Sequence, residues 1–221
     1  MASLFHLLPT LLQGAAITVV ITVGAVALMV PVAFMAGLMR LSATRLVRWP
    51  SVVFVEIFRG TSVLVQLFMF YYVLPLLGVA FDPTLTAVIV LGLNAGAYGS
   101  EVVRAATTAV ARGQWDAATA LNMPKWLTMR RVILPQAIVM MLPSFGNLAV
   151  QALKDTALAS LITIQELASN GRVLVSETHQ TGEVYILVLV IYFILAYPLI
   201  RLVRSIERHV TRGMMLGPVK P

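Results

Sequence analysis

Residues 116–135 read Asp-Ala-Ala-Thr-Ala-Leu-Asn-Met-Pro-Lys-Trp-Leu-Thr-Met-Arg-Arg-Val-Ile-Leu-Pro and form a basic, partly polar island in an apolar chain. We place Asp116 in the first turn of a short helix, where a carboxylate suits the positive helix end. Asn122 tolerates the left-handed backbone that often ends a helix. Pro124 fits the first position of a second helix, and Pro135 closes the unit. The stretch predicts two short helices joined by a tight turn.

The composition of the whole chain is that of a membrane protein. Of its 221 residues, 59% are hydrophobic and 11% are charged, whereas a soluble domain carries about 25% charged residues. The net charge is +7, but Lys and Arg occur in short clusters between apolar runs, which argues for membrane orientation and against nucleic-acid binding. The chain has no cysteine, and its histidines, at positions 6, 179 and 209, are far apart. We therefore predict no metal site.

Five apolar stretches are long enough to cross a bilayer, which takes roughly 20 helical residues. They are Ala15–Met39, Val52–Leu77, Leu85–Ala106, Val132–Leu153 and Tyr185–Val203. The apolar segment Ala157–Gln165 is too short to cross, so we expect an external amphipathic or re-entrant piece. The sequence thus predicts an all-α membrane protein with five transmembrane helices.

The basic residues predict the orientation and the boundaries. They gather in the first and third connections and in the tail, as Arg40, Arg45, Arg48, Arg112, Lys125, Arg130, Arg131, Arg201, Arg204, Arg208, Arg212 and Lys220. Because cytoplasmic loops carry the excess of Lys and Arg, the N-terminus is placed outside and the C-terminus in the cytoplasm. We expect an interfacial segment at 1–13, set off by Pro9 and Gly14, a transmembrane domain at 14–206 and a cytoplasmic tail at 207–221.

The opening stretch resembles a known loop. Asp116-Ala-Ala, three residues, Asn122, nine residues and Val132-x-Leu-Pro135 are similar to the Glu-Ala-Ala…Gly…Ile-x-Leu-Pro loop of bacterial ABC importer permeases. Asp116, Asn122 and Val132 depart from that pattern. The resemblance implies that loop 113–135 is a coupling helix docking into a partner ATPase, through Gly113, Asp116, Ala117, Ala118, Asn122, Leu134 and Pro135. The alternative is an amphipathic cytoplasmic loop without a partner.

Three further stretches resemble the polar amino acid permeases of that class. They are Glu56–Gln66, with Ser62 where the family usually has Pro, Ala97–Arg104 and Lys154–Ser160. The resemblance implies the type I importer fold in the bacterial inner membrane, a homo- or heterodimer of permeases, two ATPase subunits that bind ATP, and an extracytoplasmic substrate-binding protein. Ser62 and Leu121–Met123 are similar to the branch that carries ectoine and hydroxyectoine, which are compatible solutes.

Polar side chains recur at three- and four-residue steps in three of the expected spans, which places them on one face of each helix. Such residues are costly in a bilayer and usually face a bundle interior or a cavity. We therefore expect a hydrated translocation path lined or gated by Glu56, Arg59, Gln66, Asn94, Tyr98, Glu101, Asn147, Gln151, Lys154 and Asp155. The alternative is hydrogen bonding between helices, or pairing of Glu56 with Arg59. Gly92-Leu-Asn-Ala-Gly96 is a helix-packing signal.

The motifs that are missing narrow the function. The sequence has no Gly-x4-Gly-Lys-Ser/Thr loop, so ATP is expected on a partner and no cofactor on this chain. No nucleophile–base or metal motif is present, and no catalytic residue is predicted. A self-contained channel or secondary transporter could use the same polar faces, but five helices without an inverted repeat argue against it. An intramembrane enzyme could rest on Glu56/Arg59 and Glu101/Arg104 alone.

Overall fold

The computed structural model describes residues 7–214, without the side chains of residue 207 and of residues 209–214. Every regular element in this range is helical. Four helical runs are long and apolar enough to cross a membrane: α1 (Leu8–Arg40), α4 (Pro83–Ala109), the run Lys125–Ile162 that contains α7 (Leu134–Asp155), and α9 (Thr181–Met214) as far as Ile206. A bent pair that starts with α2 (Arg45–Gly60) is the fifth candidate. The expectation of an all-α bundle with five apolar spans is confirmed.

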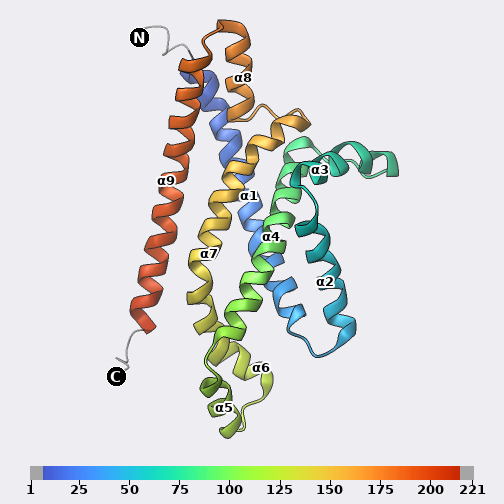
Figure 1. Cartoon of the computed structure of the whole chain (residues 1–221), viewed down its shortest axis with the longest axis vertical. Coiled ribbons are helices and arrows are strands. Elements are labelled where there is room, and N and C mark those ends of the chain that lie inside the picture. Colours follow the sequence, from blue (N-terminus) through green and yellow to red (C-terminus); the bar gives the residue numbers. More distant parts are fainter. Residues whose placement is uncertain (1–6, 215–221) are drawn as a thin grey trace.

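Helices α1 and α4 pack against each other along their length because small residues let their backbones approach (Figure 1). A Cβ atom on Gly96 would lie 2.6 Å from a methyl carbon of Val32, and one on Gly92 would lie 2.8 Å from Leu28. Any larger residue would push the helices apart. The Gly92-x-x-x-Gly96 packing signal is confirmed.

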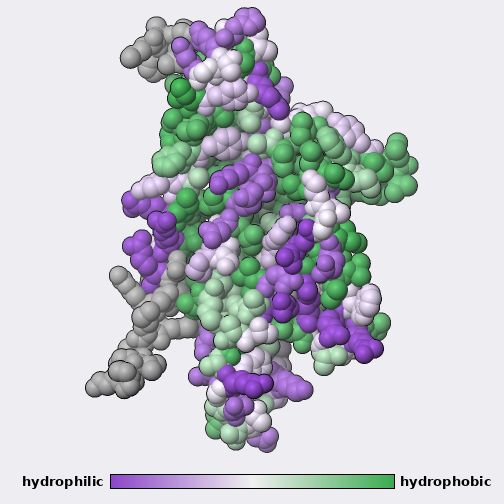
Figure 2. Space-filling view, in the orientation of Figure 1, coloured by the Kyte–Doolittle hydropathy of each residue, from purple (hydrophilic) through white to green (hydrophobic). Residues whose placement is uncertain are grey.

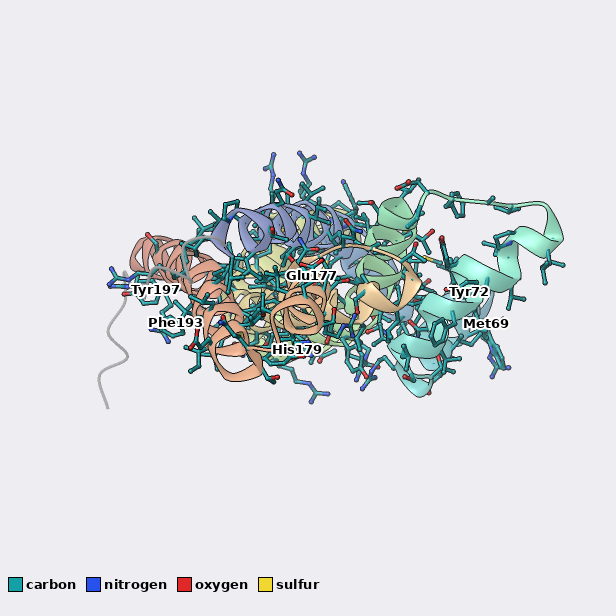
Figure 3. The ribbon with its side chains drawn as sticks, turned by 90° about the horizontal axis from the view of Figure 1, so that it is seen from above. Met69, Tyr72, Glu177, His179, Phe193 and Tyr197 are labelled. Atoms are coloured by element: carbon teal, nitrogen blue, oxygen red, sulfur yellow. The ribbon has the colours of Figure 1, made fainter. Side chains whose placement is uncertain are left out.

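The expected second span, Val52–Leu77, is broken rather than continuous. Helix α2 ends at Gly60, Thr61 and Ser62 are extended, and the chain turns by 106° into α3 (Val63–Phe68). A π-helical turn, η2 (Met69–Val73), and a 3₁₀ turn, η3 (Leu74–Leu77), lengthen α3 into an arm. Viewed from above, Met69 and Tyr72 on this arm lie on the side of the molecule opposite α9 (Figure 3).

The loop expected at one end of the bundle forms two short helices, α5 (Arg112–Ala120) and α6 (Lys125–Thr128). Helix α6 continues through the π-helical turn η4 (Met129–Ile133) into α7. At the other end lie a 3₁₀ segment, η5 (Thr156–Ile162), and α8 (Leu167–Thr178), as Figure 1 shows. Helix α8 is not among the elements predicted from the sequence.

Two expected boundaries do not coincide with breaks in the chain. Helix α1 begins at Leu8 with Pro9 in its first turn, a position where proline is tolerated. Residues 8–13 therefore continue the first helix instead of forming a separate interfacial piece. Helix α9 extends to Met214, so residues 207–214 of the expected tail are helical. Residues 1–6 and 215–221 lie outside the described part.

Candidate functional site

The turn between α5 and α6 has the geometry that the sequence predicts. Asn122 has a φ of 52°, in the left-handed region. The N–H of Met123 donates to the carbonyl of Ala118 at 3.0 Å, and the N–H of Asn122 donates to that of Thr119 at 2.9 Å. These two bonds form a Schellman motif, which satisfies the last carbonyls of α5. Asn122 is therefore confirmed as the residue that ends the first short helix.

Three details of this loop differ from the expectation. Helix α5 begins at Arg112, so Asp116 lies one turn inside the helix and not in its first turn. Pro124 is the N-cap of α6 and not its first residue. Pro135 does not close the unit, because η4 bonds the N–H of Leu134 to the carbonyl of Met129 and leads directly into α7. A π-turn changes the hydrogen-bond register, which accommodates a proline that has no N–H to donate.

The loop has one buried side and one exposed side. Ala118 is 3% exposed, and Trp115 packs onto a core cluster with Ala33, Val103 and Ile133. This contact ties α5 to α1, α4 and the start of α7. On the outer side, Asp116 and Ala117 are exposed, and Leu121 and Trp126 are 75% and 70% exposed. Gly113 is exposed, and Leu134 and Pro135 are half-buried at the junction with α7.

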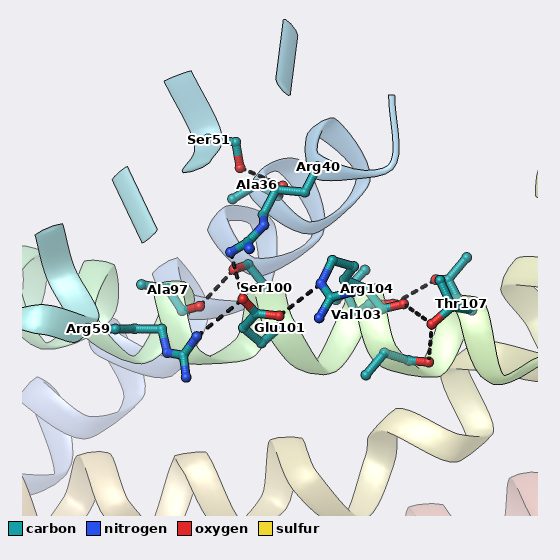
Figure 4. A network of polar contacts seen from close by, with 12 residues as sticks. Ala36, Arg40, Ser51, Arg59, Ala97, Ser100, Glu101, Val103, Arg104 and Thr107 are labelled. Atoms are coloured by element: carbon teal, nitrogen blue, oxygen red, sulfur yellow. Dashed lines mark hydrogen bonds and ion pairs between the residues drawn. The ribbon is translucent and has the colours of Figure 1, made fainter. Parts of the chain in front are cut away.

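Glu101 on α4 is the centre of a charge cluster (Figure 4). Its Oε1 lies 2.6 Å from Nη1 of Arg40 and 3.2 Å from Nη1 of Arg59, and its Oε2 lies 2.9 Å from Nε of Arg104. Arg59 also lies over the ring of Tyr98, 5.2 Å from its centroid. One carboxylate thus joins three helices, α1, α2 and α4. Arg59 pairs with Glu101 and not with Glu56, which is exposed; no ion pair of Glu56 is found among the described side chains.

A second polar contact holds the break between α2 and α3. The Nδ2 of Asn94 donates to the carbonyl of Phe58 at 2.9 Å and to Oε1 of Gln66 at 3.0 Å. The Nε2 of Gln66 donates to the same carbonyl at 2.9 Å and to Oγ1 of Thr61 at 2.8 Å. Because α2 ends here, the carbonyl of Phe58 has no helical partner, and the two amides satisfy it.

A pocket of about 420 Å³ lies beside this break, between α4 and α7. Its polar lining includes Thr61, Asn94, Tyr98, Gln151 and Asp155. Gln151 donates to Asp155 at 2.8 Å. A neighbouring pocket of about 430 Å³, between α7 and α9, is lined by Asn147, Lys154 and Arg204 and shares Gln151. Figure 2 shows hydrophilic residues in the middle of this face, between apolar surfaces.

The structure brings most of the predicted path residues together. Gln66, Asn94, Tyr98, Gln151 and Asp155 meet around the first pocket, and Asn147 and Lys154 line the second. Arg59 and Glu101 form the charge cluster beside Tyr98, and Glu56 stands apart. Sequence reasoning missed Arg40 and Thr61, although Arg40 ends the first apolar run and Thr61 lies within the Glu56–Gln66 stretch.

Glu166 was also missed. Its side chain is fully buried and caps α8, accepting from the N–H groups of Ala168 and Ser169 at 2.8 and 2.7 Å and from the Tyr192 hydroxyl at 3.0 Å. Burial raises the pKa of this carboxyl above its usual range, and the three hydrogen bonds oppose the rise without cancelling it. The sequence signal for this cap is a Glu that directly precedes an apolar residue and a helical run. The Glu166 side chain stabilises the end of the bundle opposite α5.

The fold and the polar face define a multi-pass membrane transport component. The chain belongs to the family of binding-protein-dependent transport system inner membrane components, whose pattern matches residues 29–212. It is therefore the permease subunit of an ABC importer of this kind, and a self-contained channel or secondary transporter is not supported.

The chain is similar over most of its length to several members of that family. It is 42% identical over 206 residues to the probable amino-acid ABC transporter permease protein y4tF of Sinorhizobium fredii, covering 90% of this chain and 87% of the relative. It is 37% identical to the L-cystine transport system permease protein TcyB of Bacillus subtilis, with 92% and 88% covered. It is 32% identical to the glutamine transport system permease protein GlnP of Escherichia coli, with 94% and 96% covered.

Solved structures agree with the fold. The crystal structure of an amino acid ABC transporter with histidines matches with a TM-score of 0.87 and 32% identity, covering 94% of this chain and 97% of that chain. An inward-facing form of the MetNI methionine ABC transporter matches with a TM-score of 0.74 at 20% identity, covering 95% and 99%. The second match shows the fold alone, which is that of type I importer permeases.

Proposed function

We propose that this permease carries a polar amino acid and is driven by ATPase subunits that dock on the α5–α6 loop. The main support for this proposal is that the α5–α6 loop has one buried side and one exposed side. Its buried side is tied by Trp115 to the core, while Ala117, Leu121 and Trp126 are exposed on its outer side. Apolar residues that gather on one exposed side, rather than occurring singly, are typical of an interaction surface. ATP belongs to the docked subunits, and this chain itself holds no cofactor.

We infer the orientation of the chain in the membrane, and the need for a second permease subunit, from the positions of its charged and polar residues. The positively charged α5–α6 end is placed in the cytoplasm and the α8 end outside, where the substrate-binding protein delivers its ligand. Lys154, Asp155 and Gln151 belong to the candidate membrane span Lys125–Ile162 and line the two pockets. Polar groups within a span are not left facing lipid, so a second permease subunit covers this face and completes the path.

The substrate class rests on the relatives and on the pocket. The named relatives include permeases for glutamine and L-cystine. In this chain the pockets combine cations, Lys154 and Arg204, with the carboxylate of Asp155 and with amide groups. Opposite charges within one polar face suit a zwitterion. An ectoine-like compatible solute, itself zwitterionic, remains a prediction that an uptake panel tests.

The mechanism uses two arrangements of one bundle. ATP-driven closure of the ATPases moves α5, and Trp115 passes the movement to α4 and α7, which flank the pocket. The helices then change between inward-open and outward-open states. The polar contact of Asn94 with Gln66 keeps the α2–α3 break beside the pocket. In this mechanism no residue of the chain performs a chemical step.

The test is a pull-down of the tagged full chain from its native membranes in mild detergent. An ATPase should co-purify with the wild type and be lost with Ala117→Arg, because the new charge stands on the exposed side of α5. Ala118→Arg is a poorer choice, since Ala118 is buried and its replacement would disturb the loop itself. Ser176→Arg, an exposed position on α8, is the matched control and should retain the ATPase.

Uptake by the reconstituted complex with its binding protein tests the substrate. Radiolabelled glutamine, cystine, histidine and ectoine are offered one at a time, with and without ATP. ATP-dependent uptake of one or more of the amino acids supports the proposal. Uptake of ectoine alone would assign the chain to compatible solutes, and ATP-independent uptake would overturn the importer mechanism.

A further inference from the structure

The start of α2 carries charges that oppose its own helix dipole. Arg45 and Arg48 stand in the first turns, no acidic residue lies in the first turn, and the N-cap Thr44 makes no side-chain capping bond. The N-terminus of a helix has a positive partial charge, so cations there are unfavourable and an anion is favourable. Neither arginine has an ion pair among the described side chains.

An apolar groove lies beside this helix from its second turn onward. It has a volume of about 320 Å³ and lies between α1 and α2, with α4 as its floor. Its apolar lining comprises Val32, Met35, Met39, Pro50, Phe54 and Leu93. Ser51 is also in the lining, but its hydroxyl already donates to the carbonyl of Ala36 at 2.7 Å. The groove thus offers apolar contact along about 10 Å of α1, from Val32 to Met39.

The groove and the cations belong to the same place in the fold. Pro50 and Ser51, one turn or less beyond Arg48, line the groove. In the same first turns of α2, next to these arginines, Leu46 is 85% exposed and Trp49 is 63% exposed. The α1–α2 connection lies in the lower part of the molecule, toward the end where α5 and α6 lie (Figure 1). A tryptophan beside arginines at the end of a span is typical of the membrane–water interface.

We propose that this site binds an anionic phospholipid. Its phosphate-bearing headgroup lies at the N-terminus of α2 between Arg45 and Arg48, and one acyl chain lies in the α1–α2 groove. The headgroup supplies the anion that the helix start lacks, and the chain fills the apolar lining. This inference depends on the membrane location of the chain and does not depend on the proposed substrate or ATPase.

Charge complementarity favours an anionic phospholipid over two other possible occupants, free phosphate and a second copy of this chain. Free phosphate would satisfy the arginines and leave the groove empty. A second copy of this chain would bring an identical basic edge, and the chain already carries a net charge of +7. A lipid with an anionic headgroup and an apolar tail matches both halves of the site, and juxtamembrane basic clusters attract such lipids.

The experiment is native mass spectrometry of the full chain offered an equimolar mixture of phosphatidylglycerol and phosphatidylcholine with identical acyl chains. The wild type should retain phosphatidylglycerol with at least a tenfold preference. Arg45→Gln/Arg48→Gln should lose that preference, whereas Arg45→Lys/Arg48→Lys should keep most of it. Met39→Trp should fill the groove and lower retention of both lipids several-fold.

The matched control is Arg130→Gln/Arg131→Gln, which removes the same charge from the same end of the molecule and should leave the preference unchanged. Equal retention of both lipids by the wild type would overturn the proposal. So would equal losses in the two double Gln variants, since the cations would then act only as general surface charge. If a variant is poorly folded, the wild type still decides: phosphatidylglycerol must raise its melting temperature more than phosphatidylcholine does, and equal shifts contradict the proposal.

Discussion

The Oε1 of Glu101 lies 2.6 Å from Nη1 of Arg40, and this ion pair joins the end of α1 to the middle of α4 beside the polar pocket. The same carboxylate also contacts Arg59 and Arg104. The three arginines repel one another, and their close approach is favourable only because the Glu101 carboxylate lies between them. Glu101 therefore fixes the relative positions of α1, α2 and α4, the helices that carry these arginines.

Glu101→Gln should destabilise the chain by on the order of 2 kcal/mol. The value lies below the cost of breaking a fully buried pair, because the arginines are partly exposed. Thermal unfolding in detergent measures the effect. Glu177→Gln, an exposed carboxylate on α8, is the control and should be nearly neutral. A loss no larger than that of the control would contradict the role given to this cluster.

Asn122→Val should destabilise the α5–α6 loop by about 1–2 kcal/mol, because a β-branched residue tolerates positive φ poorly. ATP-driven uptake should fall with it, since α5 would no longer end in its Schellman turn. Asn122→Gly supplies the comparison, because glycine adopts this backbone without strain. Equal uptake by the two variants would show that the turn is not needed for coupling.

Gly96→Val should separate α1 from α4. The added Cβ would meet Val32 at 2.6 Å, and overpacking of this kind costs about 1–3 kcal/mol. The fraction of monodisperse protein after extraction and its melting temperature measure the change. Gly60→Ala has open space around its Cβ and should be neutral or slightly stabilising. Similar behaviour of both variants would contradict the close-approach argument.

Glu166 predicts a pH dependence of stability. Burial raises the pKa of this carboxyl above its ordinary value, so the folded state binds its proton more tightly than the unfolded state does. Its contribution to stability is fully present below the unfolded pKa and is lost as pH rises through the folded pKa. Unfolding measured from pH 4 upward should show this decline, and Glu166→Gln should flatten it. An unchanged slope in the variant would contradict the assignment.

The parts of the fold that depend on local chemistry could be predicted from the sequence. Span length, the left-handed Asn122 and the Gly92–Gly96 packing step each follow from properties of the residues themselves. The break after Gly60 depends instead on Asn94 reaching the carbonyl of Phe58 from another helix, a long-range contact with no local signal. The same holds for Arg59: the alternative of a Glu56–Arg59 pair rested on nearness in sequence, but the carboxylate near Arg59 in space is that of Glu101.

The accessibility of a single cysteine at position 117 tests the central account most directly, because the chain has no natural cysteine. Ala117→Cys is treated with a membrane-impermeant maleimide in right-side-out and in inside-out vesicles. The account predicts labelling in inside-out vesicles alone, and strong protection when the ATPase subunits are present. Labelling from the outside, or equal labelling with and without the ATPase, would contradict the claim that α5 is the cytoplasmic docking site of this permease.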